Sequence, residues 1–200
     1  MTLVEIERKR ALDTRGAELL LARLRQHGFT ATPSIREVDT YYSRPDVDFV
    51  ETVECLRVRQ SPGGCELTYK PASNHATHSA DGTIAKQETN VALGGPKEGA
   101  NAHQLLGALG MVRLVEVDKS RTSYRRSDDA EVAVVVDVVA GLGTFVETEI
   151  VSARPRAQAL AQLDEAEHLL GLQDHPSMDQ PYRDLVLDGQ HAIGGPAQQR

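Results

Sequence analysis

The chain has 200 residues, with 22 lysines and arginines against 29 aspartates and glutamates, which gives a net charge of −7. This length corresponds to one domain, and a hydrophobic fraction of 40% suffices for a single core, which excludes wholesale disorder. An acidic chain with 4% aromatic residues lacks the basic stripes and stacking surfaces of nucleic-acid-binding proteins, so no nucleic-acid partner is expected.

The sequence also lacks signals for a membrane or an oxidising compartment. No stretch is apolar over the length of a membrane-spanning helix, and the first ten residues have no signal-peptide pattern. Cys55 and Cys65 flank a turn at residues 61–64, where hairpin pairing places Cys65 opposite Gln60 rather than Cys55. We therefore expect reduced thiols, a cytoplasmic location and no membrane partner.

Alternation and capping signals predict the elements along the chain. Residues 3–9 alternate between apolar and charged side chains, which predicts a β-strand. Asp13 is the expected N-cap of a helix that reaches about Gln26 and stops at Gly28. Further strands are predicted at about residues 35–42, 53–60, 65–70, 83–93, 112–126, 131–139 and 144–151. Helices are predicted at 101–109 with Asn101 as N-cap, at 155–170, and after Pro181.

The connections complete the predicted architecture. Residues 71–82 are small and polar without periodicity, which is typical of a loop, and residues 189–200 form a tail too rich in glycine and glutamine to fold alone. About eight strands, mostly joined by hairpins, with two longer helices between them, predict an antiparallel α+β domain. A closed barrel is one arrangement that such strands can adopt.

Charged residues share one face of several predicted strands. Glu5, Glu7 and Lys9 lie two residues apart, so a strand directs all three side chains to one side and Ile6 to the other. The same spacing relates Arg57 to Arg59, Lys86 to Glu88, Lys119 to Arg121, and Glu147 to Glu149, and Arg125 shares the face of Lys119 and Arg121. Lys70 ends the predicted hairpin strand, and Asp137 points opposite to its neighbours Val136 and Val138.

These faces have two interpretations. A solvent-exposed outer face is the commonest one for any single strand. Both signs of charge are interleaved on the same faces, however, which favours a polar cavity with the helices covering the apolar outside. Carboxylates in such a cavity could bind Mg²⁺ or Mn²⁺, and arginines and lysines could bind phosphate oxygens. The ligand that needs both is a metal-bound polyphosphate.

Other polar residues are expected to have ordinary roles. Glu165 and Glu167 in the late helix are expected to face solvent, and His75 and His78 form a loop pair that is expected to be solvated rather than to bind zinc. Tyrosines on strands are more often packing residues than contacts for a nucleobase; they are Tyr41, Tyr42 and Tyr69.

Residues 5–9, Glu-Ile-Glu-Arg-Lys, resemble the E-x-E-x-K signature of the CYTH superfamily, the triphosphate tunnel metalloenzymes, which includes class IV adenylyl cyclases and thiamine triphosphatases. The similarity continues in the same order at residues 39–42, 56–59, 67–70, 119–121, 137 with 141–149, and 180–185. The resemblance implies an eight-stranded antiparallel β-barrel with flanking helices, spanning residues 1–188, that forms a tunnel for a metal-bound triphosphate.

The resemblance also implies site residues by matching position. The carboxylates on the metal side would be Glu5, Glu7, Asp137, Glu147 and Glu149, with Mg²⁺ or Mn²⁺ as the cofactor. The residues that hold the phosphates would be Lys9, Arg57, Arg59, Lys70, Lys86, Lys119 and Arg121, with Arg125 added from its strand position alone. Catalysis would depend chiefly on Glu5, Glu7, Lys9, Arg57, Arg59 and Lys119. Lys86 stands where many members carry an arginine, so this chain keeps the charge and loses the bidentate fork.

Three functions stay open from the sequence. The first is a class IV adenylyl cyclase, which converts ATP to cyclic AMP and pyrophosphate, because residues 48–52 and 141–147 resemble the cyclase branch more closely. The second is a tripolyphosphatase or thiamine triphosphatase, in which water replaces the ribose hydroxyl as nucleophile. The third is a non-catalytic module that binds nucleotides or polyphosphate. The expected protein is a monomer or homodimer.

Overall fold

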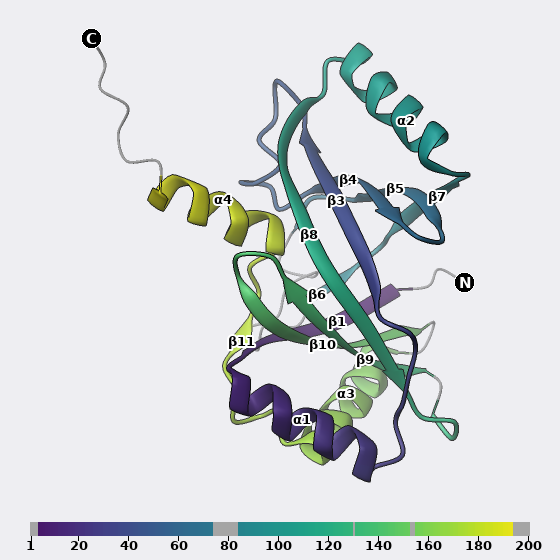
Figure 1. Cartoon of the computed structure of the whole chain (residues 1–200), viewed down its shortest axis with the longest axis vertical. Helices are drawn as coiled ribbons and strands as arrows, with labels where there is room; N and C mark the ends of the chain where they lie inside the picture. The colour runs from purple at the N-terminus through teal and green to yellow at the C-terminus, as the bar shows by residue number, and fades with distance from the viewer. Residues whose placement is uncertain (1–3, 74–83, 130, 153–154, 194–200) are drawn as a thin grey trace.

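The computed structural model describes residues 4–73, 84–129, 131–152 and 155–193, which form one antiparallel sheet with four helices among these residues (Figure 1). Eight strands have five residues or more: β1 (Val4–Leu12), β3 (Ile35–Ser43), β4 (Cys55–Ser61), β5 (Gly64–Lys70), β7 (Thr89–Leu93), β8 (Val112–Arg125), β9 (Val132–Val139) and β10 (Gly143–Ser152). Three are shorter: β2 (Thr30–Ala31), β6 (Ile84–Lys86) and β11 (Ser177–Met178). The helices are α1 (Thr14–Gln26), α2 (Pro96–Ala108), α3 (Arg156–Leu170) and α4 (Tyr182–Ile193).

The strand order is β11-β1-β10-β9-β8-β3-β4-β5-β7, with β2 paired to β8 and β6 paired to β1. The predicted α+β class is therefore confirmed. The predicted strand at 83–93 is wrong as one element, because its described part divides into β6 and β7 at Gln87 and Glu88. β6 pairs with β1 while β7 pairs with β5, so this segment reaches strands near both ends of the sheet order. Closure of the sheet into a barrel stays a prediction.

Helices cover the apolar face of β1, β9 and β10 (Figure 1). Leu12, Val134 and Val146 pack with α1 and the end of α3, and Ile6, Val132 and Ile150 pack with Leu163 and other α3 residues. Because side chains alternate along a strand, burial of Ile6 under α3 directs Glu5 and Glu7 to the opposite face. This confirms, for β1, β9 and β10, the prediction that helices cover the apolar side of the strands, with Glu5 and Glu7 on the other side.

Helix boundaries follow capping chemistry. Asp13 is the N-cap of α1, as predicted, and its Oδ1 accepts a hydrogen bond from Gly16 N at 2.6 Å. The prediction for α2 is wrong, because that helix begins at Pro96 and not near Asn101. Proline suits the first turn of a helix, and Glu98 accepts from Gly95 N at 2.8 Å, so the helix starts a turn and a half earlier. α4 follows Pro181 as predicted and continues through residues 189–193 of the expected tail.

Glu167 corrects the expectation of a solvated face on α3. Its side chain is 1% exposed and binds Arg8 and Arg10, which project from the helix-covered face of β1. The cysteines follow the prediction: both are free, and Cys65 pairs with Gln60. His75 and His78 lie outside the described residues. No described helix combines the length and apolar character needed to span a membrane.

Candidate functional site: a charged cavity on the inner face of the sheet

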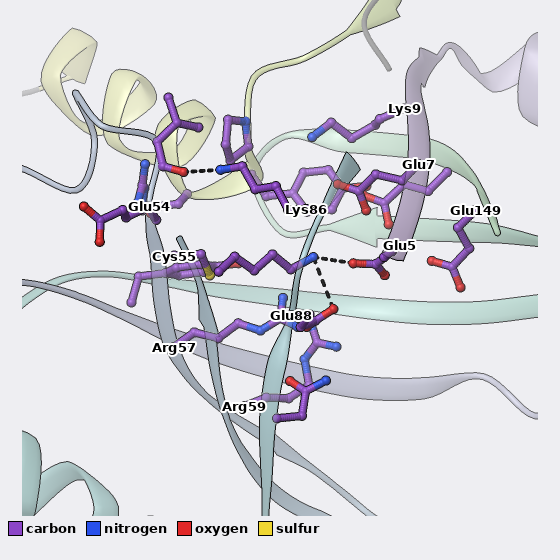
Figure 2. Close-up of a pocket in the computed structure, with 18 of the residues that line it drawn as sticks. Glu5, Glu7, Lys9, Glu54, Cys55, Arg57, Arg59, Lys86, Glu88 and Glu149 are labelled. Atoms are coloured by element: carbon purple, nitrogen blue, oxygen red, sulfur yellow. Dashed lines mark hydrogen bonds and ion pairs between the residues drawn. The ribbon is translucent and has the colours of Figure 1, made fainter. Parts of the chain in front are cut away.

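A cavity of about 300 Å³ lies on the charged face of the sheet. Strands β1, β4, β5, β8 and β10, the β6–β7 segment and the start of α4 contribute to its lining. Figure 2 shows Glu5, Glu7 and Glu149 on one side of it and Arg57 reaching in from the other, while the Lys86 side chain extends away from the glutamates to donate to Val53 O. The sequence-predicted residues that line the cavity are Glu5, Glu7, Lys9, Arg57, Arg59, Lys70, Lys86, Lys119, Arg121, Glu147 and Glu149.

Strand register brings the first and tenth strands together at this site. β1 pairs with β10 so that Glu7 stands opposite Glu149 and Lys9 stands opposite Glu147. Directly opposed residues on one face have Cβ atoms about 5 Å apart. The two-residue spacing in both strands therefore concentrates carboxylates, with Lys9 beside them.

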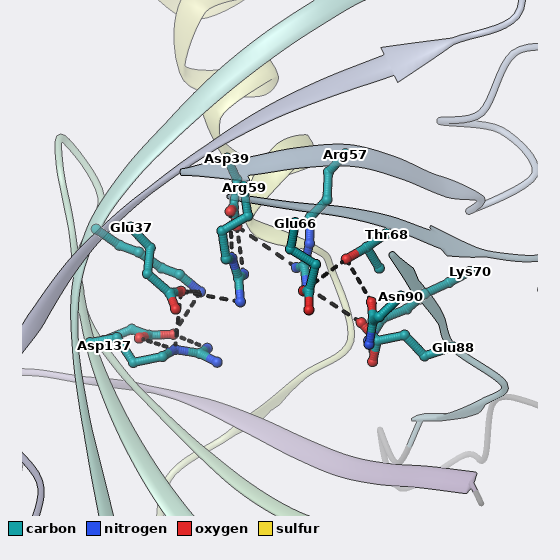
Figure 3. Close-up of polar contacts among 12 residues, drawn as sticks. Glu37, Asp39, Arg57, Arg59, Glu66, Thr68, Lys70, Glu88, Asn90 and Asp137 are labelled. Carbon is teal, nitrogen blue, oxygen red and sulfur yellow. Dashed lines mark hydrogen bonds and ion pairs between the residues drawn. The ribbon is translucent and has the colours of Figure 1, made fainter. Parts of the chain in front are cut away.

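The arginines are fixed by buried carboxylates behind the lining (Figure 3). Arg59 donates to both oxygens of Asp39, at 2.6 and 2.7 Å. Burial opposes ionisation of Asp39, but Arg57 and Arg59 outweigh it and hold the pKa of this carboxyl well below its usual range. A bidentate pair with a carboxylate that stays charged fixes the guanidinium plane, which preorganises it for an anion.

Asp137 orients the cationic side chains of β8 in the same way that Asp39 orients Arg59. Its two oxygens accept from Arg121 Nε and Nη2 at 2.8 and 2.6 Å, and Lys119 Nζ lies 3.5 Å away. Asp137 is fully buried and is not among the residues that line the cavity. The structure thus places this predicted metal-side carboxylate behind the cations. Arg125 also lies outside the cavity lining, exposed on β8 where that strand pairs with β2.

The carboxylates facing the cavity differ in their partners. Glu147 accepts from Arg121 Nη2 at 2.5 Å, and Glu5 accepts from Lys70 Nζ at 2.5 Å. Burial would raise the pKa of Glu147, but Arg121 and the nearby lysines lower it to about 2. For Glu149, burial together with Glu147, Glu5 and Glu7 outweighs Arg121 and raises the pKa to about 7. Burial likewise raises the pKa of Glu7, to which Glu5 and Glu147 add.

These carboxylates fit part of a divalent metal site. The described residues contain no group of three or more His, Cys, Asp or Glu side chains arranged to hold a metal ion by themselves. Mg²⁺ commonly uses only one or two carboxylates and completes its shell with water and substrate phosphates. Glu5, Glu7 and Glu149 supply hard oxygen ligands. Burial first, and neighbouring carboxylates in addition, raise the pKa of all three, so their charged forms are destabilised without a cation and a bound cation would stabilise them.

Several residues in or behind the lining were not among the predicted site residues. Glu37 and Asp39 lie behind the lining and Tyr41 lies in it. The three alternate along β3 as Glu5, Glu7 and Lys9 do along β1, and residues 39–42 resemble the family, so the sequence carried a signal for them. Glu37 Oε2 lies 3.3 Å from Arg59 Nη1 and 3.4 Å from Lys119 Nζ. The others are Glu54, Glu66, Asn90, Tyr182 and Arg183. Strand spacing relates Glu66 to Lys70 and Asn90 to Glu88, and residues 180–185 resemble the family, whereas Glu54 carried no such signal.

Three of the lining residues carry buried polar atoms without a hydrogen-bond partner among the described residues. These atoms are Arg57 Nε, Tyr182 Oη and Arg183 Nη2. Each can donate a hydrogen bond, and buried donors are normally paired. Three unpaired donors in one cavity indicate that an acceptor-rich ligand completes the site.

Comparison with known proteins identifies relatives over most of the chain. The CYTH domain family model matches residues 3–182. A Methanocaldococcus jannaschii protein named "Putative adenylate cyclase MJ0240" is 27% identical over 148 residues, which cover 74% of this chain and 77% of that protein. The structure of Pyrococcus horikoshii PH1819 superposes with a TM-score of 0.73 at 24% identity, covering 92% of this chain and 99% of the other. HpAC1 from Hippeastrum is reported as a putative adenylyl cyclase with a dominant triphosphatase activity. Its structure superposes with a TM-score of 0.67 at 16% identity, covering 94% of this chain and 96% of the other.

Proposed function

The chain belongs to the CYTH family, and on that premise we propose that it is a metal-dependent enzyme acting on a triphosphate in the cavity described above. The observation that carries the proposal is that the cavity contains two kinds of charged side chain. Some are cationic and held in place by buried acids, and others are carboxylates whose charged form a bound cation would stabilise. Arg59 and Arg121 are oriented by buried acids, while Glu7 and Glu149 carry raised pKa values. A metal-bound triphosphate presents the complementary pattern of anionic oxygens and a divalent cation.

The residues have separable parts in the proposed reaction. Arg57, Arg59, Lys119 and Arg121 bind and orient the phosphate oxygens and stabilise the charge that develops on the leaving group. Glu5, Glu7 and Glu149 would hold Mg²⁺ or Mn²⁺, which when bound would neutralise phosphate charge and polarise the bond that breaks. Lys9 stands opposite Glu147 and Lys70 donates to Glu5, so these two lysines compensate carboxylates that the substrate must approach.

Our first candidate reaction is that of a class IV adenylyl cyclase. The 3′-hydroxyl of ATP attacks the α-phosphorus, cyclic AMP forms and pyrophosphate leaves. The similarity to the Methanocaldococcus jannaschii protein supports this candidate, as do residues 48–52 and 141–147. Positioning of the triphosphate supplies much of the rate, because it fixes the geometry of attack.

Hydrolysis is the second candidate, and the size of the cavity favours it. About 300 Å³ is at the lower end of roughly 300–1,000 Å³ for small-molecule sites. A space of this size, lined mostly by charged groups, suits inorganic triphosphate or the triphosphate of thiamine triphosphate better than a complete nucleotide. Water then replaces the ribose hydroxyl, and orthophosphate is released.

One assay series separates these candidates. Purified protein is incubated with ATP, inorganic tripolyphosphate or thiamine triphosphate in the presence of Mg²⁺ or Mn²⁺, and cyclic AMP, pyrophosphate and orthophosphate are measured. Cyclic AMP and pyrophosphate in equal amounts support the cyclase, and orthophosphate without cyclic AMP supports the triphosphatase. Glu7→Gln is expected to abolish turnover, whereas Glu165→Gln on the exposed part of α3 retains it. Binding without turnover of any substrate would identify a non-catalytic module and refute the proposal.

A further inference from the structure

The start of α4 places an aromatic residue against two cations of the cavity. Lys9 Nζ lies 4.5 Å from the centre of the Tyr182 ring and Lys119 Nζ lies 5.4 Å from it. Lys9 Nζ also donates to Gln180 O at 2.6 Å, two residues before Tyr182. The face of an aromatic ring attracts ammonium groups at these distances. Tyr182 and two phosphate-binding candidates therefore form one packed unit.

The packing of Tyr182 needs only its ring. The ring meets Phe145 edge-on, with 5.0 Å between ring centres, and belongs to a core cluster with Tyr41, Val115 and Val117. The side chain is 6% exposed, yet Oη is buried with no hydrogen-bond partner among the described residues. An unpaired buried hydroxyl is destabilising, and phenylalanine would fill the same space without that cost. Packing of the ring alone therefore does not account for the hydroxyl in the unliganded protein.

The surroundings of Oη indicate what it binds. Burial first, and then the negative charges of Glu147 and Asp137, hold the pKa of Tyr182 well above its usual value. Asp137 is near enough to add a weak hydrogen-bonding contribution, but it does not meet Oη at hydrogen-bond geometry, so the hydroxyl keeps its proton and can donate to a ligand. The next residue, Arg183, is 1% exposed; it donates to Glu54 O and Asp184, and leaves Nη2 buried without an acceptor. Two consecutive residues thus present unused donors to the cavity beside Lys9 and Lys119, and these groups together match an anionic oxygen.

We propose that Tyr182 is a substrate-binding residue whose hydroxyl donates a hydrogen bond to a phosphate oxygen of the triphosphate. The ring is fixed by Phe145 and by the ammonium groups of Lys9 and Lys119, so the donor is positioned before the ligand arrives. This inference rests on the proposed function, because it takes the ligand to be a triphosphate. It adds a contact from outside the sheet to those made by the strands.

Tyr182→Phe tests the proposal, because it removes one oxygen and keeps the packing. We expect the affinity for inorganic tripolyphosphate with Mg²⁺, measured by titration calorimetry, to fall by about 10-fold or more, as for loss of a hydrogen bond to a charged group. The midpoint of thermal unfolding of the unliganded variant should be equal to or higher than that of the parent protein. Weaker binding without loss of stability is a combination that a structural hydrogen bond cannot produce.

Tyr42→Phe is the matched control. Tyr42 is 5% exposed, but its hydroxyl lies 2.6 Å from His103 Nδ1 of α2, away from the cavity. This variant should lose stability and keep its affinity. The proposal is overturned if Tyr182→Phe binds tripolyphosphate within about twofold of the parent protein, a ratio well below that expected for a lost charged hydrogen bond. Failure of the parent protein to bind any triphosphate would instead refute the proposed function, and this inference with it.

Discussion

At the scale of single residues, the cations of the cavity are paired with buried acids that do not line it. Asp137 lies behind Arg121 and Lys119 and has no exposed surface. Asp39 does the same for Arg57 and Arg59. Removing such an acid leaves cations buried without compensation, so stability and binding should suffer together.

Asp137→Asn tests this arrangement. We expect the free energy of unfolding, measured in a denaturant series, to fall by about 3–5 kcal/mol, as for other buried pairs that lose one partner. The affinity for tripolyphosphate should also fall, because Arg121 loses its bidentate anchor. Asp118→Asn is the control, since Asp118 pairs with Arg36 at the surface and should leave both quantities unchanged. Equal stability of the two variants would contradict this account.

Lys86 gives the cavity a pH dependence. Burial lowers the pKa of Lys86 to about 8, and its ammonium donates to Val53 O. Because the charged form is lost as pH rises through this pKa, the KM for the triphosphate should increase between about pH 7 and 9. Lys86→Arg keeps the charge over this range and should flatten the increase. Ionisation of the substrate affects both proteins equally, so an identical rise in KM would refute the role of Lys86.

At the scale of elements, the helix-covered face determines which side of each strand faces the cavity. Leu163 of α3 is fully buried against the face of the sheet that carries Ile6 and Ile150. Leu163→Ala should lower the free energy of unfolding by about 2–5 kcal/mol, measured by urea denaturation. Leu105→Ala in α2 is the control, because Leu105 is 57% exposed and little buried surface is lost. A small effect at both positions would show that α3 packing contributes little.

Much of this architecture was predictable, because the alternation of apolar and charged side chains along a strand can be read from a few consecutive residues. The alternation of residues 5–9 indicated both the strand and its charged face, and Asp13 marked the start of α1. The break at Gln87 and Glu88 was not predictable, since it arises where one segment pairs first with β1 and then with β5. Those pairings depend on residues distant in the chain.

The same distinction applies to the candidate site. Residues on β1, β4, β8 and β10 could be assigned from spacing and family resemblance, and the cavity lining includes nearly all of them. The position of Asp137 behind Arg121 required the register between β8 and β9. Tyr182 belonged to a recognised C-terminal motif, but its contact with Lys9 exists only after α4 has packed against β8 (Figure 1).

At the scale of the whole molecule, the ligand is expected to connect strands from different parts of the sheet. Metal and triphosphate bound together would join β1 and β10 to β4 and β8. At about 100 times the dissociation constant, binding adds roughly 2.7 kcal/mol to the stability of the folded state. Tripolyphosphate with Mg²⁺ should therefore raise the unfolding midpoint by roughly 5–10 °C in calorimetry. Mg²⁺ alone should give a smaller shift, and equal shifts would argue against completion of the metal site by phosphate.

The distribution of charge has a kinetic consequence. Eight basic and seven acidic residues line the cavity, which leaves a net charge of −8 on the rest of the chain. Three acids of that remainder, Glu37, Asp39 and Asp137, are buried behind the lining, and the other acids of the remainder still outnumber its bases. A polyanion must therefore diffuse through a repulsive outer field before it meets the fixed arginines. Added salt screens that field beyond about 8 Å at physiological ionic strength. The association rate of tripolyphosphate, measured by stopped flow, should stay constant or rise with salt, whereas binding of a polyanion to a basic surface slows.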